Sequence, residues 1–287
     1  MKTGVAGVCL GLLGWALWLA PASAEPSPQN PPATIWYSEQ FIVHSRFVGR
    51  DYLIQVARPH KPPSAKIPAI YVLDANSRFG EVADMAGEFA DSGEIAPAYV
   101  IGIAYPDQRT ETSGTLREHD YLHVARSGSQ PAPAGFGEGA RFQKFITEEL
   151  RPLIEARYPV AADRAILLGH SFGGLFALHV LLNDPGAFWT YLIGSPSIWA
   201  EPGLLDQAAA FKAASPVRVF LGVGAKEEAQ APALHEVTTV RALAARLAGH
   251  ASGAEVELWE APDETHATVV PGFMSRALRF ALGTTAP

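Results

Sequence analysis

The chain has 287 residues, 48% of them hydrophobic, and a formal net charge of −7, a composition that suits a globular protein with a sizeable buried core. It contains no basic run and no arginine-rich face, so we expect no nucleic-acid partner. Its one cysteine, Cys9, excludes a disulfide framework.

The first residues have the pattern of an export signal. Lys2 gives a basic start, residues 5–19 form an apolar run, and Ala22-Ser23-Ala24 is a small-residue cleavage motif. We predict a signal peptide over residues 1–24, a proline-rich linker over 25–38 and a catalytic domain over 39–287, in a periplasmic or secreted protein. The apolar run is short and broken by glycine, so no stable membrane span is expected in the mature chain, and a retained anchor is the alternative.

Strand and helix patterns alternate after the linker. Residues 40–46 and 50–58 alternate in polarity and predict an antiparallel hairpin at a sheet edge. Buried strands are predicted at 67–74, 98–104, 165–168, 190–193, 217–223 and 255–260, and helices at 79–91, 138–158, 175–182, 234–248 and 269–282. This order favours a single α/β domain with a mostly parallel central sheet flanked by helices.

Residues 105–137 interrupt this alternation. They are polar, rich in Gly, Pro, Ser and Arg, and follow a predicted strand end. A connection of this length in a compact domain is usually functional or disordered, so we predict a functional loop.

A G-x-S-x-G motif joins the strand at 165–168 to the helix at 175–182. The turn Gly169-His170-Ser171-Phe172-Gly173 therefore has the strand, turn and helix context of a nucleophile elbow, in which the serine Oγ is presented at the top of a sheet. Ser171 is the candidate nucleophile. His170 is expected to face away from it and to pack behind it.

A nucleophilic serine needs an imidazole that takes its proton and a carboxylate that orients the imidazole. Of nine histidines, His266 follows the last predicted strand and precedes the last helix, so it should reach the carboxyl edge of the sheet with Ser171. The acid is expected between serine and histidine in the sequence. Glu227, just after the strand at 217–223, is the first choice, Glu228 the second and Asp263 the third.

The oxyanion that forms during ester cleavage needs two hydrogen-bond donors. The backbone N–H of Phe172 should supply one, and the turn after the strand at 67–74 should supply the other. We favour the amide of Ala75, with Asn76 beside it. Asp74 precedes the serine, so we expect it to hold the turn and not to act as the catalytic acid.

Two further features have plainer interpretations. His119 and His123 lie four residues apart, as helical metal ligands would, but no third ligand stands at a recognisable spacing. We therefore expect no metal and no cofactor. Trp199 ends a strand-exit loop and is expected to line the substrate pocket.

The sequence resembles the α/β-hydrolases, and more closely the esterase D-like group that includes the enterobactin and salmochelin siderophore esterases of bacteria. The resemblance runs from about residue 40 to 282. Its motifs are residues 71–76 (YVLDAN, where the group favours Gly in place of Ala75), Arg117-Glu118-His119-Asp120-Tyr121 (R-x-x-D-Y), residues 145–152, 169–175 and 195–199, the Glu227 turn and residues 265–267.

The resemblance implies that Arg117 lies near the mouth of the site, where it would meet an anionic ligand. Arg109 and Arg126 stand in the same polar segment. The alternative is that Arg117 pairs with Asp120 or another local carboxylate and holds the loop.

Together these residues predict an exported serine hydrolase that cleaves carboxylic esters through an acyl-enzyme. A small-molecule ester is the expected partner, and a ferric siderophore of the trilactone class is one candidate. The chain lacks the separate substrate-grasping domain of some siderophore esterases, so a smaller acyl or phenolic ester remains open. A peptidase or an acyltransferase would use the same residues, whereas the intact order of Ser171, Glu227 and His266 argues against a non-catalytic binding protein.

Overall fold

The computed structural model describes residues 34–107, 110–123, 137–249 and 253–284. Residues 35–287 form a compact unit, and this second unit of the chain contains every strand and helix described below. The predicted signal peptide, Cys9, Arg109 and Arg126 lie outside the described residues. No helix in the described segments is both long enough and apolar enough to cross a bilayer.

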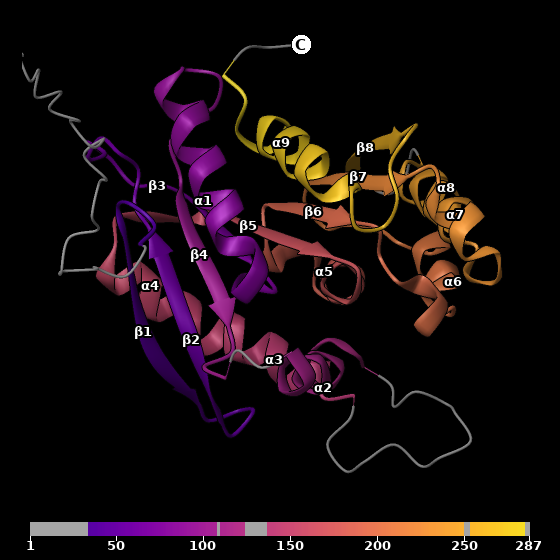
Figure 1. Cartoon of the computed structure of the whole chain (residues 1–287), viewed down its shortest axis with the longest axis horizontal. Helices are drawn as coiled ribbons and strands as arrows, with labels where there is room; N and C mark the ends of the chain where they lie inside the picture. Colours follow the sequence, from indigo (N-terminus) through magenta and orange to yellow (C-terminus); the bar gives the residue numbers. More distant parts are fainter. Residues whose placement is uncertain (1–33, 108–109, 124–136, 250–252, 285–287) are drawn as a thin grey trace, which may run out of the picture. The chain divides into compact units, whose positions relative to one another are not determined.

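One eight-stranded sheet organises the second unit, with the strand order β1-β2-β4-β3-β5-β6-β7-β8 (Figure 1). The first two strands form an antiparallel hairpin and β2 is antiparallel to β4, whereas the remaining pairs are parallel. The predicted α/β-hydrolase fold and its edge hairpin are confirmed. The strands are β1 (Ser38–Ser45), β2 (Arg50–Ala57), β3 (Ile67–Val72), β4 (Tyr99–Ala104), β5 (Val160–His170), β6 (Thr190–Gly194), β7 (Val217–Gly224) and β8 (Ala254–Ala261).

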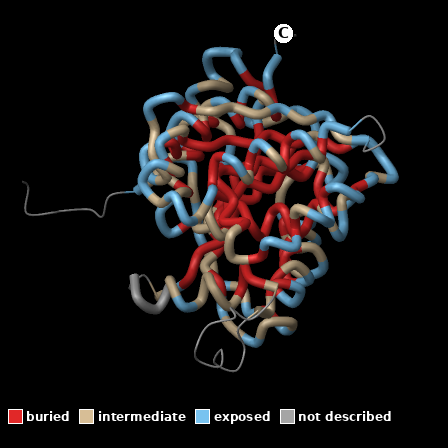
Figure 2. Tube along the Cα trace, turned by 90° about the vertical axis from the view of Figure 1, so that its right-hand side faces the viewer, coloured by how far each residue is buried: buried red, intermediate tan, exposed pale blue. Residues whose placement is uncertain are grey.

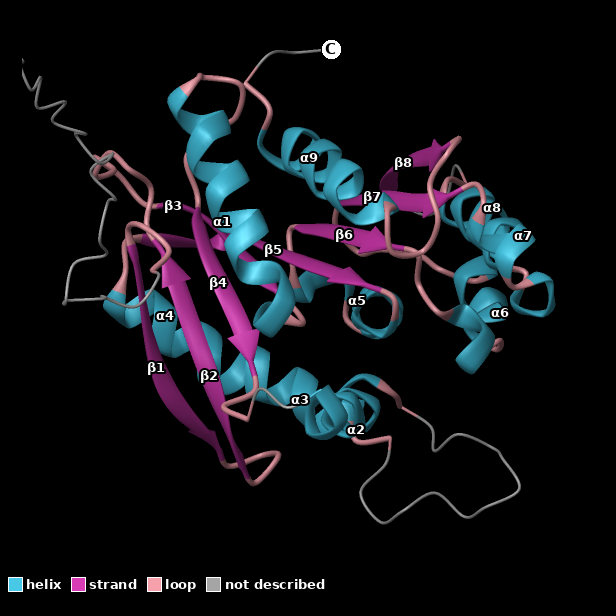
Figure 3. Ribbon diagram, in the orientation of Figure 1, coloured by secondary structure: helices cyan, strands magenta, loops and turns pink. Residues whose placement is uncertain are grey.

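Helices cover both faces of the sheet (Figure 3). Apolar residues of α1 and α9 pack on one face, and those of α3, α4, α5, α6 and α8 pack on the other. The α-helices are α1 (Ala75–Asp91), α2 (Thr110–Tyr121), α3 (Gly139–Lys144), α4 (Arg151–Arg157), α5 (Phe172–Asn183), α6 (Leu204–Ala209), α7 (Glu227–Gln230), α8 (Glu236–Leu247) and α9 (Val269–Leu282). A π-helical turn over Phe145–Leu150 joins α3 to α4.

The core follows from the alternation of side chains along the central strands. Tyr71 and Leu167 contribute to the cluster beneath α5, while their neighbours Val72 and Leu168 contribute to the cluster beneath α1 and α9. Because both faces are covered, parallel strands of this kind are apolar throughout. Figure 2 shows the buried residues gathered in the interior of the unit, with exposed segments around them.

The structure corrects the sequence prediction in two places. Part of the segment 105–137, predicted as a loop, forms the helix α2. Its sequence has no continuous apolar stripe, so helical periodicity gave no signal. The second correction concerns α1, which begins at Ala75, directly after Asp74, and not near Phe79.

Candidate active site

The strand order creates a crevice at the carboxyl edge of the sheet. From β3 the chain moves to β4 on one side and later returns to β5 on the other, so the connections diverge between β3 and β5. Open α/β sheets bind their ligands at such a switch point. Asp74 lies just after β3 and Ser171 directly after β5, so the predicted nucleophile lies at this crevice.

Ser171 has the strained backbone of an elbow. Its φ of 61° and ψ of −122° lie in a region that L-residues rarely occupy. The turn is tight because a Cβ added at Gly169 would lie 2.2 Å from the carbonyl oxygen of Gly173, and one at Gly174 would lie 2.6 Å from that of Gly194. Only glycine fits at these two positions, so the packing holds Ser171 in its unusual conformation.

The predicted acid and the predicted base are in contact. The Nδ1 atom of His266 lies 2.7 Å from Oε2 of Glu227. The other oxygen of Glu227 accepts hydrogen bonds from Ser195 Oγ at 2.6 Å and from the backbone N–H of Gly224 at 2.7 Å. Glu227 is 4% exposed, and three donors fix the position of its carboxylate.

The two alternative acids point elsewhere. Glu228 accepts hydrogen bonds from the backbone N–H and the hydroxyl of Thr238, at 2.7 and 2.9 Å. Asp263 is exposed and pairs with Lys226 Nζ at 3.0 Å. Of the three candidates, Glu227 alone has a hydrogen bond to His266 in the described part of the chain.

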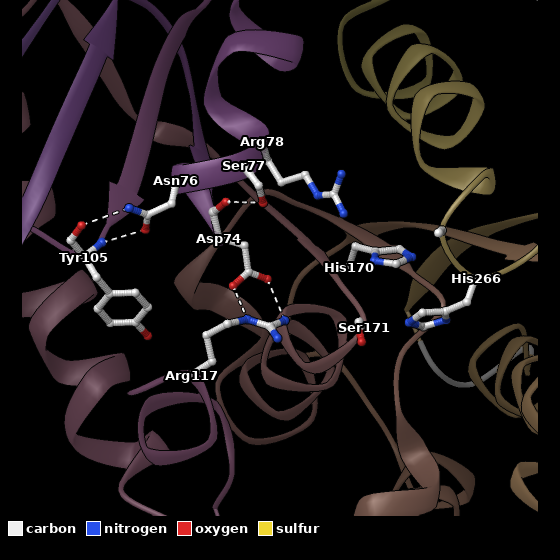
Figure 4. A pocket seen from close by; sticks show the side chains of 10 residues that line it. Asp74, Asn76, Ser77, Arg78, Tyr105, Arg117, His170, Ser171 and His266 are labelled. Carbon is white, nitrogen blue, oxygen red and sulfur yellow. Dashed lines mark hydrogen bonds and ion pairs between the residues drawn. The ribbon is translucent and has the colours of Figure 1, made fainter. Parts of the chain in front are cut away.

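Ser171 lies where two cavities meet. The larger, with a volume of about 420 Å³, is lined by Asp74, Asn76, Arg78, Arg117 and His170 among others (Figure 4). The smaller, of about 310 Å³, is lined by Phe172, Trp199, Leu234, Glu227 and Glu236 among others. Both cavities also include Ser171, His266 and Arg117.

The hydroxyl of Ser171 lies 3.3 Å from that of Ser197. No hydrogen bond from Ser171 to His266 is present among the described contacts. In hydrolases the hydrogen bond between serine and histidine is often long without substrate and shortens when substrate binds. The observation that bears on such a pair is therefore that Ser171 and His266 line the same two cavities.

The two predicted oxyanion donors begin the helices that flank the crevice. Ala75 opens α1 and Phe172 opens α5, so neither backbone N–H has an acceptor within its own helix. The side chain of Asn76 donates to the carbonyl of Tyr105 at 2.9 Å and accepts from its N–H at 2.8 Å. Asn76 therefore ties the start of α1 to the end of β4 at the cavity wall (Figure 4).

Arg117 is paired with a carboxylate. Its Nε and Nη2 atoms donate to the two oxygens of Asp74, the second over 2.9 Å. The guanidinium also lies over the rings of Tyr121 and Phe172, at 5.7 and 5.8 Å. The charge and hydrogen bonds of Asp74 raise the pKa of Arg117 although burial opposes this shift. The alternative pairing with a local carboxylate is thus observed, with Asp74 and not Asp120 as the partner.

The other two residues of the R-x-x-D-Y motif also hold the site together. Asp120 is completely buried and accepts hydrogen bonds from Tyr52 at 2.7 Å and from Tyr105 at 3.1 Å. The hydroxyl of Tyr121 accepts the backbone N–H of Asp74 at 3.0 Å. Through these contacts α2 is joined to β2, β4 and the turn after β3.

His170 lies closer to Ser171 and His266 than the sequence predicted. It lines the larger cavity beside Ser171, where we expected it to face away, and its ring centroid lies 4.7 Å from that of His266. Burial, together with the nearby positive charges of His266, Arg78 and Arg117, lowers the pKa of His170 to about 3. It is a neutral imidazole at physiological pH.

His119 and His123 do not share a site. The helix α2 ends at Tyr121, so the helical spacing is broken before His123. His119 lies against Arg50 at 3.0 Å, whereas the His123 ring stacks on that of His179 with centroids 3.7 Å apart. The described residues contain no group of three or more side chains arranged to hold a metal ion.

Three residues of this region had no role in the sequence analysis. Ser195 orients Glu227, and the SPSIW motif was the one signal that pointed to it. Glu236 is 5% exposed, and burial, with the charges of Glu227 and Glu228, raises its pKa to about 8. Arg78 had no sequence signal, because its position depends on where α1 begins.

Comparisons with known proteins identify the family of this chain. A family model described as "Putative esterase" matches residues 45–267. The chain is 36% identical over 271 residues to the ferri-bacillibactin esterase BesA of Bacillus subtilis (strain 168), covering 88% of this chain and 92% of that protein. It is 34% identical over 188 residues to the siderophore triacetylfusarinine C esterase of Aspergillus fumigatus, covering 63% of each. The crystal structure of the BES protein from Bacillus cereus matches with a TM-score of 0.78 and 31% identity, over 90% of this chain and 99% of that one.

Proposed function

The chain belongs to this esterase family, in the siderophore esterase group of the α/β-hydrolases, and on that premise we propose that it is an exported serine esterase that cleaves the ester bonds of siderophores. The observation that carries the proposal is the contact of His266 with Glu227, a buried carboxylate that accepts three hydrogen bonds. Both His266 and Glu227 lie beside the cavities that contain the strained Ser171.

The proposed reaction proceeds through an acyl-enzyme. Ser171 Oγ attacks the ester carbonyl carbon while His266 Nε2 takes the hydroxyl proton, and Glu227 stabilises the imidazolium through Nδ1–H. The backbone N–H groups of Phe172 and Ala75 donate to the carbonyl oxygen as it becomes negative. The C–O bond to the alcohol then breaks, and His266 returns the proton to the leaving oxygen. Water, deprotonated by His266, cleaves the acyl-enzyme by the same steps.

The substrate class is proposed from the relatives and from the two cavities. The named relatives act on ferri-bacillibactin and triacetylfusarinine C. An ester placed across Ser171 would have its acyl part in one cavity and its alcohol part in the other. Arg117, Asn76 and Trp199 are wall residues that would contact it.

Export is the second part of the proposal. It rests on the apolar run and the Ala22-Ser23-Ala24 motif of residues 1–24, followed by the linker 25–38 and the catalytic domain 39–287. Amino-terminal sequencing of the protein isolated from its own cells is expected to read from Glu25. A sequence that reads from the start of the chain would show a retained anchor instead.

Replacement of Ser171 tests the mechanism. Because the hydroxyl is the proposed nucleophile, Ser171→Ala should lower ester turnover by about a thousandfold or more. Ser92→Ala, which removes an exposed hydroxyl at the far end of α1, is the matched control with turnover like the wild type. A fluorophosphonate probe should label Ser171 alone, as read by peptide mass spectrometry. Labelling of another residue would reject the assignment.

A substrate panel tests the siderophore class. Mass spectrometry should detect hydrolysis products from ferric and iron-free trilactone siderophores. The kcat/KM for these trilactones should be well above that for short-chain acyl esters. If only the short-chain esters were hydrolysed, the siderophore class would be rejected and the protein would be a general carboxylesterase.

A further inference from the structure

Two guanidinium groups line the larger cavity, and they differ in their partners. Arg117 donates to both oxygens of Asp74, so the two formal charges cancel. Asp74 is also the one acidic side chain among the described residues that line this cavity. After this pairing the described part of the lining offers no carboxylate to balance the second guanidinium, that of Arg78.

Arg78 is directed into the cavity. It lies on the first turn of α1 and is half-buried, and Figure 4 shows its side chain running toward His170 with no dashed line to any residue drawn. Within the described segments its guanidinium makes no ion pair or hydrogen bond, although its backbone N–H donates to the carbonyl of Asp74. Exposed arginines often lack partners, but this one is partly desolvated on the wall that also contains Ser171.

The surroundings of Arg78 add to its positive field. Asp74, Asn76, Ser77 and Arg78, which line the cavity, lie at the N-terminal end of the 17-residue helix α1, where the helix dipole is positive. His170, on the other side, is neutral. The larger cavity therefore carries an unbalanced positive charge in a chain whose net charge is −7.

The smaller cavity has the opposite character. Two buried acids, Glu227 and Glu236, contribute to its wall beside the rings of Phe172 and Trp199. Glu236 is protonated near neutral pH because its pKa is raised to about 8, so it is the carboxylate of Glu227 that would repel an anionic group there, whereas Arg78 would attract one. The asymmetry fixes which side of Ser171 receives the charged part of a substrate.

We propose that Arg78 is a specificity-determining residue that binds the anionic chelating group of the substrate in the larger cavity and favours ferric catecholates over neutral ferric hydroxamates. A ferric tris-catecholate is a trianion, whereas a ferric trihydroxamate core is neutral. A guanidinium offers paired N–H donors to catecholate oxygens, and a half-desolvated site strengthens that interaction. This proposal rests on the proposed function, since it names the class of siderophore.

Competitive inhibition by chelates without ester bonds tests the proposal. The probes are the ferric complex of a tris-catecholamide built on a benzene ring, which is a trianion, and ferrioxamine E, a neutral ferric trihydroxamate. Inhibition constants are measured against hydrolysis of the neutral ester 4-nitrophenyl acetate, each variant being compared with its own uninhibited rate. Wild type should bind the trianion more tightly than the neutral chelate.

In Arg78→Ala the inhibition constant of the trianion should rise about tenfold or more, equivalent to about 1.4 kcal/mol, with a much smaller change for ferrioxamine E. Arg78→Lys should retain part of the preference, because the charge remains and the paired donors are lost. Arg157→Ala removes an equal charge from α4, away from both cavities, and should keep the wild-type constants.

Equal inhibition of wild type by both chelates, or equal changes for both in Arg78→Ala, would overturn the role of Arg78. The readout needs no siderophore hydrolysis. If trilactones are not cleaved but the trianion preference depends on Arg78, the proposed substrate fails while the anion subsite stands.

Discussion

The carboxylate of Glu227 shows how one buried side chain can be assigned a single task. Its two oxygens face different partners, with His266 on one and Ser195 and Gly224 on the other. A neutral amide at this position would keep the shape but lose the charge that stabilises the imidazolium in the proposed reaction.

We therefore expect Glu227→Gln to lower kcat on an aryl ester by about a hundredfold or more, with little change in KM. Glu228→Gln is the matched control, because Glu228 bonds to Thr238 on α8 and should leave kcat as in the wild type. Steady-state kinetics of both variants gives the ranking. The reverse ranking would transfer the role to Glu228.

Glu236 should make stability depend on pH. Burial raises its pKa to about 8 from an ordinary value of 4.5, so between these pH values the folded chain holds a proton that the unfolded chain has released. The contribution of Glu236 to the free energy of unfolding should then fall by about 1.4 kcal/mol for each pH unit across this window, and change no further above it.

Glu236→Gln removes this titration. Its melting temperature relative to wild type should increase from pH 5 to pH 8 and then level off, as measured by calorimetry. Glu88→Gln, on the exposed side of α1, should follow the wild-type profile throughout. Parallel curves for Glu236→Gln and wild type would contradict a protonated Glu236.

Sequence reasoning found the residues whose positions follow from strand order. Ser171, Glu227 and His266 each follow a parallel strand, so their meeting at one edge could be predicted from the order of elements. The burial of Glu236 and the free charge of Arg78 could not. The burial of Glu236 depends on how α8 packs beside α7, and the charge of Arg78 depends on whether Asp74 pairs with Arg78 or with Arg117. Neither contact produces a periodic pattern in the sequence.

At the scale of elements, α2 illustrates a helix held by polar contacts. It packs with α3 and α5, and the buried Asp120 joins it to Tyr52 on β2 and to Tyr105 after β4. Arg50 Nη1 lies 3.3 Å from the same carboxylate. The R-x-x-D-Y motif drew attention to Asp120 in the sequence, but its long-range partners could be identified only in the folded chain.

Removing the charge of Asp120 should loosen this assembly. Asp120→Asn removes a completely buried charge, leaves the half-buried Arg50 without its counter-charge and should lower the free energy of unfolding by about 3 kcal/mol. Asp84→Asn, on an exposed position of α1, is the matched control and should change it little. Chemical denaturation measures both. A value for Asp120→Asn within about 0.5 kcal/mol of wild type would show that the network does not stabilise the fold.

At the scale of the whole chain, residues 35–287 contain both core clusters and all of the proposed active site. A unit with its own core can fold alone. A chain that begins at Ile35 should therefore keep the melting temperature and the kcat/KM of the full-length protein. A clear fall in either quantity would show that residues 1–34 contribute to the folded enzyme.

The meeting of two cavities at Ser171 has a consequence for cyclic substrates. When a lactone ring opens on Ser171, the leaving hydroxyl stays tethered to the acyl group and remains beside it at a high effective concentration. Re-closure of the ring then competes with water until that hydroxyl leaves its cavity. In the proposed reaction, the first cleavage of a trilactone would thus be committed by a local movement of the substrate, whereas each later cleavage would release a separate alcohol that diffuses away.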